Sequence, residues 1–307
     1  MKKDLISIED LNKQKLVQYL NLAEKMERLP DAEKRTMLAG KILAVLFFEP
    51  STRTRLSFEA AMQRLGGSVI GFSESGGSSV SKGETIKDTI CTVENYADAI
   101  VIRHHKEGTA RLAAESCRVP VINAGDGANQ HPTQTLLDLY TIQKIRGKFD
   151  GLRIAMAGDL KYSRTIHSLI QALAKFDNVH VHLVSPESLK LPEHIKRSIE
   201  GKAITWHEDG NIVESVTSCD ILYMTRIQRE RFPDALEYEK VKDSFCVDRN
   251  LLKNAQPHLK VLHPLPRVNE IHPDVDSTPF AGYFEQVKNG LIMRQAILFH
   301  LIGGLNT

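Results

Sequence analysis

The stretch from Ile42 to Gly67 reads ILAVLFFEPSTRTRLSFEAAMQRLGG and decides the fold. Its first seven residues form an unbroken apolar run, which is typical of a strand buried on both faces of a sheet. Pro50 ends that run, and apolar residues then recur at helical spacing from Leu56 to the glycine pair that ends the helix. The stretch therefore predicts a strand, a tight turn and a helix in immediate succession.

The turn between this strand and helix has the chemistry of an anion site. Ser51 or Thr52 can cap the helix, and the backbone N–H groups of the first turn point at whatever lies in front of it. Arg53 and Arg55 add two permanent positive charges where a helix N-terminus ordinarily favours acidic groups. Phosphate oxygens would compensate for both features, so we expect a bound phosphate rather than a surface turn with two solvated arginines.

The composition is that of a globular protein without a strong charge. The 307 residues are enough for two α/β domains, and 42% hydrophobic with 25% charged residues is ordinary. The 40 Lys and Arg residues nearly balance the 38 Asp and Glu residues, so we expect no nucleic-acid partner. The N-terminus lacks the apolar core of a signal peptide, and no apolar run approaches the roughly 20 residues of a membrane helix. We therefore expect a cytoplasmic protein that does not bind membranes.

Predicted strands and helices alternate along the whole chain, which favours parallel sheets with helices on both faces. We predict two doubly wound α/β domains. The first is residues 1–133, completed by a C-terminal helix at about 286–307 that packs back on it, and the second is residues 134–285. The expected strands are 42–48, 68–72, 99–103 and 119–123 in the first domain, and 153–158, 180–185, 203–207, 220–224, 245–247 and 260–263 in the second. The polar piece from Arg226 to Tyr238 is interpreted as an irregular, mobile loop.

The residues that directly follow the predicted strands are the candidates for binding, because ligands of open α/β sheets lie at the carboxyl ends of the strands. Nearly every strand is followed by a basic or amide side chain, which indicates a substrate or substrate pair with several negative charges. These segments are Glu49 to Thr54, Arg103 to His105, Asn123 to Gln134, Gly158 to Arg164, Thr225 to Gln228, and His263 to Arg267.

Several familiar chemistries do not fit. The turn at Gly158 has one glycine where a dinucleotide fold needs three, and Gly125 to Gln130 lacks the third. The sequence contains neither a Walker-type lysine loop nor a serine between the glycines of a nucleophile elbow. His180 and His182 could share one face of a strand, but no third ligand lies nearby in sequence. The four cysteines have no paired spacing. We therefore expect no metal and no cofactor.

In combination, these motifs resemble the aspartate carbamoyltransferase family across essentially the whole chain. Ser51-Thr52-Arg53-Thr54-Arg55 is similar to the carbamoyl phosphate loop of transcarbamoylases, and His131-Pro132-Thr133-Gln134 is similar to their carbamoyl-binding turn. The aspartate branch is indicated by the segments Ser81 to Glu84, Asp159 to Arg164, Thr225 to Gln228, and His263 to Arg267. The Ser-Met-Gly segment and the cysteine in the His-Pro turn of the ornithine branch are missing here. Arginines also suit the two carboxylates of aspartate and would repel the cationic side chain of ornithine.

The resemblance implies transfer of the carbamoyl group of carbamoyl phosphate to the amino group of L-aspartate, an early step of pyrimidine synthesis. Catalysis would consist of positioning and oxyanion stabilisation, without a covalent intermediate. The implied phosphate ligands are Ser51, Thr52, Arg53, Thr54 and Arg103. The carbonyl oxygen would receive hydrogen bonds from Thr54, Arg103 and His131, and the carbamoyl NH2 group would bind Gln134 and the carbonyls of Pro264 and Leu265. Aspartate would bind Lys82, Arg164, Arg226 and Gln228. The catalytic residues would be Arg53, Thr54, Lys82, Arg103 and His131, and whether His131 is neutral or cationic stays open.

The resemblance also implies a homotrimer in which Lys82 and a nearby serine reach the active site of the neighbouring chain. Ser78, Ser79 and Ser81 all lie close to Lys82, and we choose Ser79. Whether two trimers join regulatory chains stays open. Two alternatives remain: a transcarbamoylase for a different amine, and a non-catalytic protein that binds phosphorylated ligands.

Overall fold

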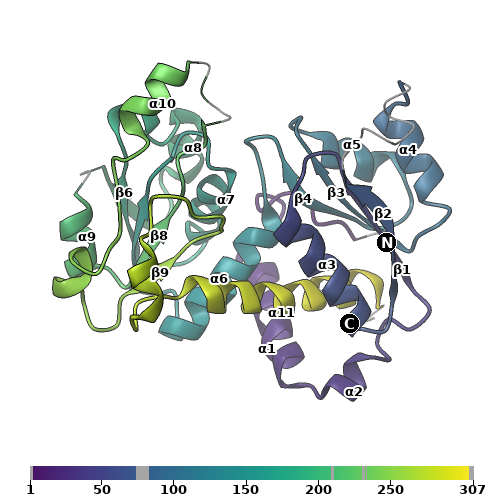
Figure 1. Ribbon diagram of the computed structural model, residues 1–307. Coiled ribbons are helices and arrows are strands. Elements are labelled where there is room, and N and C mark those ends of the chain that lie inside the picture. Colours follow the sequence, from purple (N-terminus) through teal and green to yellow (C-terminus); the bar gives the residue numbers. More distant parts are fainter. Residues whose placement is uncertain (1–2, 74–82, 209–210, 230–231, 233, 304–307) are drawn as a thin grey trace. The chain divides into compact units, whose positions relative to one another are not determined.

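The structure, a computed structural model, describes residues 3–73, 83–208, 211–229, 232 and 234–303. The chain forms two compact units: unit 1 is Met1–Tyr140 with Asn289–Thr307, and unit 2 is Thr141–Lys288. The chain passes between the units inside two helices, α6 (Pro132–Arg146) and α11 (Tyr283–Ile302). Each unit is a parallel sheet with helices, as the sequence predicts (Figure 1).

Unit 1 contains a four-stranded sheet in the order β2-β1-β3-β4. The strands are β1 (Ile42–Phe47), β2 (Ser68–Ser73), β3 (Ala99–His104) and β4 (Val121–Asp126). The helices are α1 (Lys13–Arg28), α2 (Asp31–Lys34), α3 (Thr52–Arg64), α4 (Ile86–Val93) and α5 (Thr109–Ser116). Helix α3 lies on one face of the sheet, and α4 and α5 lie on the other, as right-handed crossovers require (Figure 1). The strand order reverses between β1 and β3, the position where such sheets bind ligands.

Unit 2 contains a five-stranded parallel sheet in the order β7-β6-β5-β8-β9. The strands are β5 (Arg153–Ala157), β6 (Val179–Val184), β7 (Ile204–His207), β8 (Ile221–Met224) and β9 (Lys260–Leu262). The helices are α7 (Arg164–Leu173), α8 (Glu193–Ile199), α9 (Ile212–Ser218) and α10 (Ala235–Val241). Here the strand order reverses between β5 and β8.

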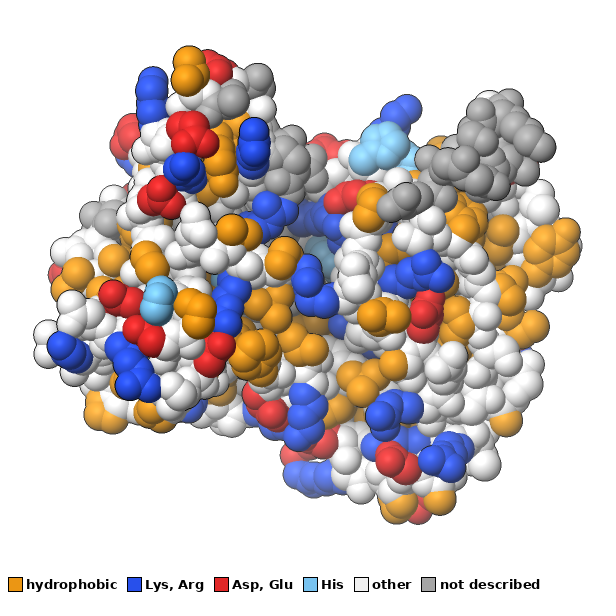
Figure 2. All heavy atoms as spheres, in the orientation of Figure 1, with side chains coloured by type: hydrophobic (Ala, Val, Ile, Leu, Met, Phe, Trp, Pro, Cys, Tyr) orange, Lys and Arg blue, Asp and Glu red, His pale blue; other side chains and the backbone are white. Residues whose placement is uncertain are grey.

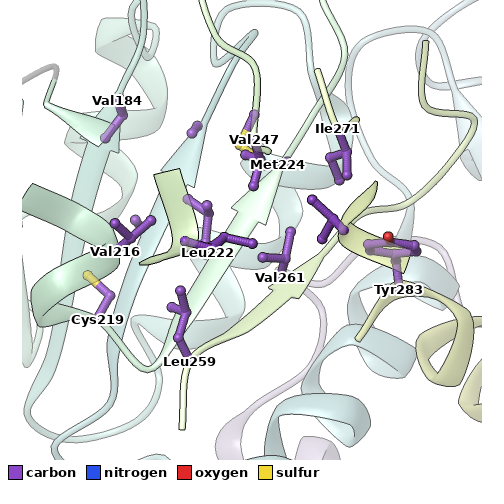
Figure 3. Close-up of a cluster of buried hydrophobic side chains, with 14 residues drawn as sticks. Val184, Val216, Cys219, Leu222, Met224, Val247, Leu259, Val261, Ile271 and Tyr283 are labelled. Atoms are coloured by element: carbon purple, nitrogen blue, oxygen red, sulfur yellow. The ribbon is translucent and has the colours of Figure 1, made fainter. Parts of the chain in front are cut away.

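One hydrophobic core of unit 2 lies beside β8 and β9. Leu222 and Val261 pack with Val216 and Cys219 from α9 and its C-terminal end, and the cluster extends to Tyr283 at the start of α11 (Figure 3). Burial of apolar surface at about 25 cal/mol per Å² makes clusters of this kind the main source of stability. This core supports the strand ends from which the candidate site of unit 2 is built.

The C-terminal helix packs back on the first domain, as the sequence predicts. The Arg294 guanidinium donates a hydrogen bond to Ser57 of α3, and the His300 ring meets the Tyr19 ring of α1 edge-on at 5.1 Å between centroids. Tyr19 is buried, so this face of α11 belongs to the core of unit 1.

Three local predictions differ from the structure. The expected strand at 245–247 is reduced to an isolated bridge between Val247 and Ile271, because only this one residue exchanges backbone hydrogen bonds with its neighbour. The segment interpreted as irregular from Arg226 to Tyr238 contains the start of α10, whose N-cap Asp234 accepts the Leu236 N–H at 2.8 Å. Helix α2 was not predicted, since one turn is too short to show periodicity.

The surface carries mixed charges. In Figure 2, Lys and Arg side chains lie among Asp and Glu side chains over the visible face, in keeping with the net charge of +2. None of the helices in the described ranges is long and apolar enough to cross a membrane.

Candidate active site

The carbamoyl phosphate loop of the sequence prediction forms the junction between β1 and α3. Ser51 is the N-cap residue, with an extended backbone, and the first bond of the helix runs from the Arg55 N–H to the Ser51 carbonyl at 3.2 Å. The expected capping bond is wrong for Ser51, because its hydroxyl accepts no hydrogen bond from the first turn. The positive end of the helix dipole therefore faces the turn without a capping hydroxyl from Ser51.

The two arginines of this turn are placed differently. Arg53 is exposed at the start of α3, whereas the Arg55 guanidinium bonds Glu59 one turn along the helix at 2.6 Å. Thr54, between them, is buried. Arg55 is thus held along the helix surface, and Arg53 is the more exposed of the two arginines at the start of the helix.

Arg103 lies beside this turn because β1 and β3 are neighbours in the sheet. Phe47 is paired with Arg103 in register, and the Phe48 N–H donates to the Arg103 carbonyl at 2.9 Å. The guanidinium donates to Glu49 at 2.8 Å and to the Ala124 carbonyl at 3.3 Å, and the side chain is mostly buried. The predicted phosphate ligands are therefore gathered at the point where the strand order of unit 1 reverses.

A buried carboxylate organises the loop that leads to His131. Asp126, at the end of β4, is 2% exposed and accepts hydrogen bonds from the N–H groups of Gly108 and Gln130 and from the amide of Asn123. Because two of these donors lie outside β4, Gly108 before α5 and Gln130 just before α6, the carboxylate fixes the loop and hence the start of α6.

His131 directly precedes α6 and Gln134 lies in its first turn, and both residues are buried. The Gln134 N–H donates to the His131 carbonyl at 3.0 Å, so the two residues keep a fixed spacing. The Nε2 atom of Gln134 donates to the Asp138 carboxylate at 2.9 Å. The Oε1 atom of Gln134 therefore points away from Asp138. Asp138 is fully buried, so its carboxylate holds the Gln134 side chain in place.

In unit 2 the aspartate motifs meet at the ends of β5 and β8. A Cβ atom on Gly158 would lie 2.1 Å from the Thr225 carbonyl oxygen, so only glycine permits this approach. The Thr225 N–H donates to the Ala157 carbonyl at 2.9 Å, and the Gln228 side-chain amide donates to the Tyr162 carbonyl at 3.4 Å. The segment that carries Arg226 and Gln228 is therefore tied to the turn that precedes Arg164, the first residue of α7.

Asp159 holds that turn together. Its carboxylate is fully buried and accepts the N–H groups of Lys161 and Tyr162 at 3.1 and 2.9 Å. Burial raises the pKa of this carboxyl, although the N–H donors act in the opposite direction. Its place within the turn indicates a structural part in arranging Arg164 rather than a direct part in catalysis.

Pro264 and Leu265 follow β9, the strand next to β8. The nearby Arg267 is held in a two-pronged ion pair with Asp276, with 2.6 Å for one of its two bonds, and donates to the Tyr283 hydroxyl at 3.0 Å. Arg267 therefore fastens this loop within unit 2. Lys82 and Ser79 lie outside the described residues. Among the described residues, no group of three or more His, Cys, Asp or Glu side chains is arranged to hold a metal ion.

Comparison with family models accounts for both units. Residues 3–144 match the carbamoyl-P binding domain of aspartate/ornithine carbamoyltransferases, and residues 150–301 match the Asp/Orn binding domain of the same family. The chain belongs to the aspartate/ornithine carbamoyltransferase family. The resemblance inferred from the motifs is thereby confirmed.

Relatives within this family are similar over their whole length. The chain is 57% identical to the aspartate carbamoyltransferase catalytic subunit of Thermococcus onnurineus and 55% identical to that of Methanopyrus kandleri, and each alignment covers 98% or more of both chains. Among solved structures, the catalytic subunit of M. jannaschii aspartate transcarbamoylase has a TM-score of 0.90 at 52% identity, over 98% of both chains. The Trypanosoma cruzi enzyme in complex with N-(phosphonacetyl)-L-aspartic acid has a TM-score of 0.91 at 40% identity, over 98% of this chain and 96% of that one.

The two matched domains divide the predicted site residues along the chain. The residues from Ser51 to Gln134 fall in the part matched by the carbamoyl-P binding domain, and those from Arg164 to Leu265 fall in the other part. Sequence reasoning missed the supporting role of the acidic groups behind them, the partly buried Glu49 and the buried Asp126, Asp138 and Glu270. A signal existed for Asp138 alone, because it lies one helical turn after Gln134.

Proposed function

We propose that this protein is an aspartate carbamoyltransferase, which transfers the carbamoyl group of carbamoyl phosphate to L-aspartate in pyrimidine synthesis. The observation that carries the proposal is the gathering of Arg164, Arg226 and Gln228 around the ends of β5 and β8 in a chain 57% identical to a named aspartate enzyme. Two arginines match the two carboxylates of aspartate. In the relatives from Trypanosoma cruzi, complexes with carbamoyl phosphate and with aspartate support the same substrates.

Carbamoyl phosphate is held mainly by unit 1. The turn from Ser51 to Thr54 and the Arg103 guanidinium bind the phosphate, with Arg53 supplying the exposed charge. Thr54, Arg103 and His131 donate to the carbonyl oxygen, and Gln134 with the Pro264 and Leu265 carbonyls accepts from the NH2 group. Donors placed at the developing oxyanion are typically worth about 3–4 kcal/mol each in the transition state.

Aspartate is held by Arg164, Arg226 and Gln228, with Lys82. Its neutral amine attacks the carbonyl carbon, and the negative charge moves to the carbonyl oxygen. The intermediate then collapses, the bond from carbon to the phosphate oxygen breaks, and the departing phosphate takes the proton that the amine loses. The products are N-carbamoyl-L-aspartate and phosphate, and no covalent enzyme intermediate is required.

The domain roles, assembly and location belong to the same proposal. Residues 1–133 with 286–307 form the carbamoyl phosphate domain, and residues 134–285 form the aspartate domain. Lys82 and Ser79 serve the site of a neighbouring chain in a cytoplasmic homotrimer. Catalysis needs neither a cofactor nor a metal.

The reaction is tested by following ureido product formation from carbamoyl phosphate with L-aspartate, and with L-ornithine in parallel. We expect product with aspartate only. Product with ornithine alone would contradict the choice of substrate. Absence of product with either amine, from a folded protein that binds phosphate, would favour the non-catalytic phosphorylated-ligand binder.

The shared site is tested by mixing two inactive variants, Lys82→Gln and His131→Gln, under conditions that exchange subunits. If Lys82 acts in the neighbouring chain's site, some mixed sites contain both native residues, and activity returns. If Lys82 acts within its own chain, every site keeps one defect, and the mixture stays inactive.

A further inference from the structure

His263 sits directly before the Pro264-Leu265 turn and is 1% exposed. Its Nδ1 atom accepts the backbone N–H of Leu265 at 2.7 Å, and its Nε2 atom lies 2.7 Å from Glu270 Oε1. The backbone N–H of His263 itself donates to Gln286 at 2.8 Å. The imidazole is therefore fixed on both sides of its ring and at its backbone.

These contacts determine the tautomer of the imidazole. A backbone N–H only donates, so Nδ1 must carry the lone pair, and Nε2 must carry the hydrogen that faces the carboxylate. The other Glu270 oxygen accepts the N–H groups of Val268 and Asn269, both at 3.1 Å. Burial lowers the pKa of His263, with the charges of Arg226 and Arg267 acting in the same direction. Burial would raise the pKa of Glu270, but hydrogen bonds from His263 and the backbone outweigh it and lower that pKa. The pair is a neutral imidazole on an ionised carboxylate.

The bond to Nδ1 closes the turn at a residue with an unusual backbone. Leu265 has φ of +55°, in the left-handed region that residues with a side chain rarely adopt. Such conformations persist where surrounding contacts hold them, and they cluster at functional sites. Here the contact on the Leu265 N–H is the His263 ring, whose orientation Glu270 sets.

We propose that His263 is a positioning residue for carbamoyl recognition: held by Glu270 as the Nε2–H tautomer, it fixes the Leu265 backbone, and with it the Pro264 and Leu265 carbonyls that accept from the carbamoyl NH2 group. The inference rests on the proposed function, which assigns those carbonyls to the substrate. The turn then contributes to binding of a ligand with an NH2 group and contributes nothing to binding of phosphate alone.

Two substitutions of His263 each remove one of the two hydrogen bonds of the ring and keep the other. In His263→Asn, the Oδ1 atom can still accept an N–H two residues ahead, but the side chain is too short to reach Glu270. In His263→Gln, the amide can still donate to Glu270, but the acceptor for Leu265 is lost. His194→Asn, at an exposed position of α8, is the matched control.

The measurement is calorimetric binding of phosphonoacetamide, a stable analogue with an amide NH2 group, and of inorganic phosphate. We expect His263→Gln to weaken phosphonoacetamide at least ten-fold with phosphate unchanged within two-fold. We expect His263→Asn to retain most of the selectivity and the control to match the wild type. Kinetics should show a higher KM for carbamoyl phosphate in His263→Gln, with a smaller change for aspartate.

Other outcomes would contradict either the positioning role of His263 or the proposed function. Equal weakening of both ligands, or a Gln variant no worse than the Asn variant, would overturn the positioning role, since either shows a general structural effect. If His263→Gln does not fold, a folded His263→Asn with lost selectivity overturns it as well. A wild-type protein that binds phosphate but neither binds the analogue nor forms product would instead overturn the proposed function.

Discussion

The Nη1 atom of Arg294 in α11 donates to the Ser57 hydroxyl of α3 at 2.9 Å, across 237 positions of sequence. The guanidinium also lies over the Phe58 ring, 5.1 Å from its centroid. Burial lowers the pKa of Arg294 to about 10, and the negative charge of the buried Asp138 opposes that shift. The C-terminal helix is thus attached to the phosphate-loop helix and lies near the carboxylate that anchors Gln134.

Replacing Arg294 should destabilise the protein. Arg294→Met removes the bond to Ser57 and the positive charge that acts on the buried Asp138, and losing a hydrogen bond of a charged group costs roughly 1.5–3 kcal/mol. Arg294→Lys keeps a charge and should lose less. Urea unfolding measures both, with Arg118→Met at an exposed position as the control. A Lys variant less stable than the Met variant would show that shape, and not charge, governs this site.

Arg53 should be the main cationic donor of the phosphate loop. Arg53→Gln removes the exposed charge in front of α3, and we expect kcat/KM to fall by roughly 10²–10³, as for loss of one transition-state donor. Arg64→Gln, near the other end of the same helix, should leave the kinetics unchanged. Comparable losses in both variants would point to general electrostatic attraction of the substrate.

Arg226 should act on aspartate alone. Loss of a charge-assisted bond of about 2–3 kcal/mol predicts that Arg226→Gln raises the KM for aspartate roughly 30- to 160-fold. The affinity for phosphonoacetamide should stay within a few-fold of wild type. Arg249→Gln is the control, because this exposed arginine bonds Ser277 at the surface of unit 2. An unchanged KM for aspartate would remove Arg226 from the substrate site.

The stability of the protein should depend on the protonation of His104. Burial lowers the pKa of this imidazole to about 4, with the positive charges of His105 and Lys106 acting in the same direction, from an ordinary value of 6.5. The unfolded chain therefore binds the proton first, so this contribution to stability is complete above pH 6.5 and is lost as the pH falls towards 4. The loss should amount to roughly 2–3 kcal/mol.

His104→Asn provides the measurement, because its Oδ1 atom can replace Nδ1 as the acceptor for the Lys106 N–H and does not titrate in this range. Urea unfolding at pH 7 and at pH 4.5 should show a smaller drop for the variant than for the wild type. Equal drops would assign the acid sensitivity to other groups.

Much of the fold followed from local patterns. The apolar run at β1, the glycine pair after α3 and the regular alternation of elements depend on residues close in sequence, and these predictions are confirmed by the structure. The strand predicted at 245–247 and the missed start of α10 fall where patterns are short and polar, so that tertiary contacts determine the local conformation.

For the candidate site, too, some residues were predictable from local sequence and others were not. The loop from Ser51 to Thr54 and the arginines after the strands were recognisable because their residue types carry the chemistry. Their supporting partners were not, because Glu49 meets Arg103 across 54 positions and Asp126 reaches Gly108 across 18. Such pairs exist only after the strands have aligned.

By itself, then, the sequence determined the parallel α/β class, the donor chemistry at the strand ends and the family, since each depends on residue type and short-range spacing. The tertiary structure alone decided that β1 lies beside β3 and β5 beside β8, that Arg55 bonds Glu59 while Arg53 stays exposed, and that His263 accepts from Leu265. The physical reason is that burial and hydrogen-bond partners are set by the packing of distant segments, where a polar group removed from water must find a partner that no local pattern specifies.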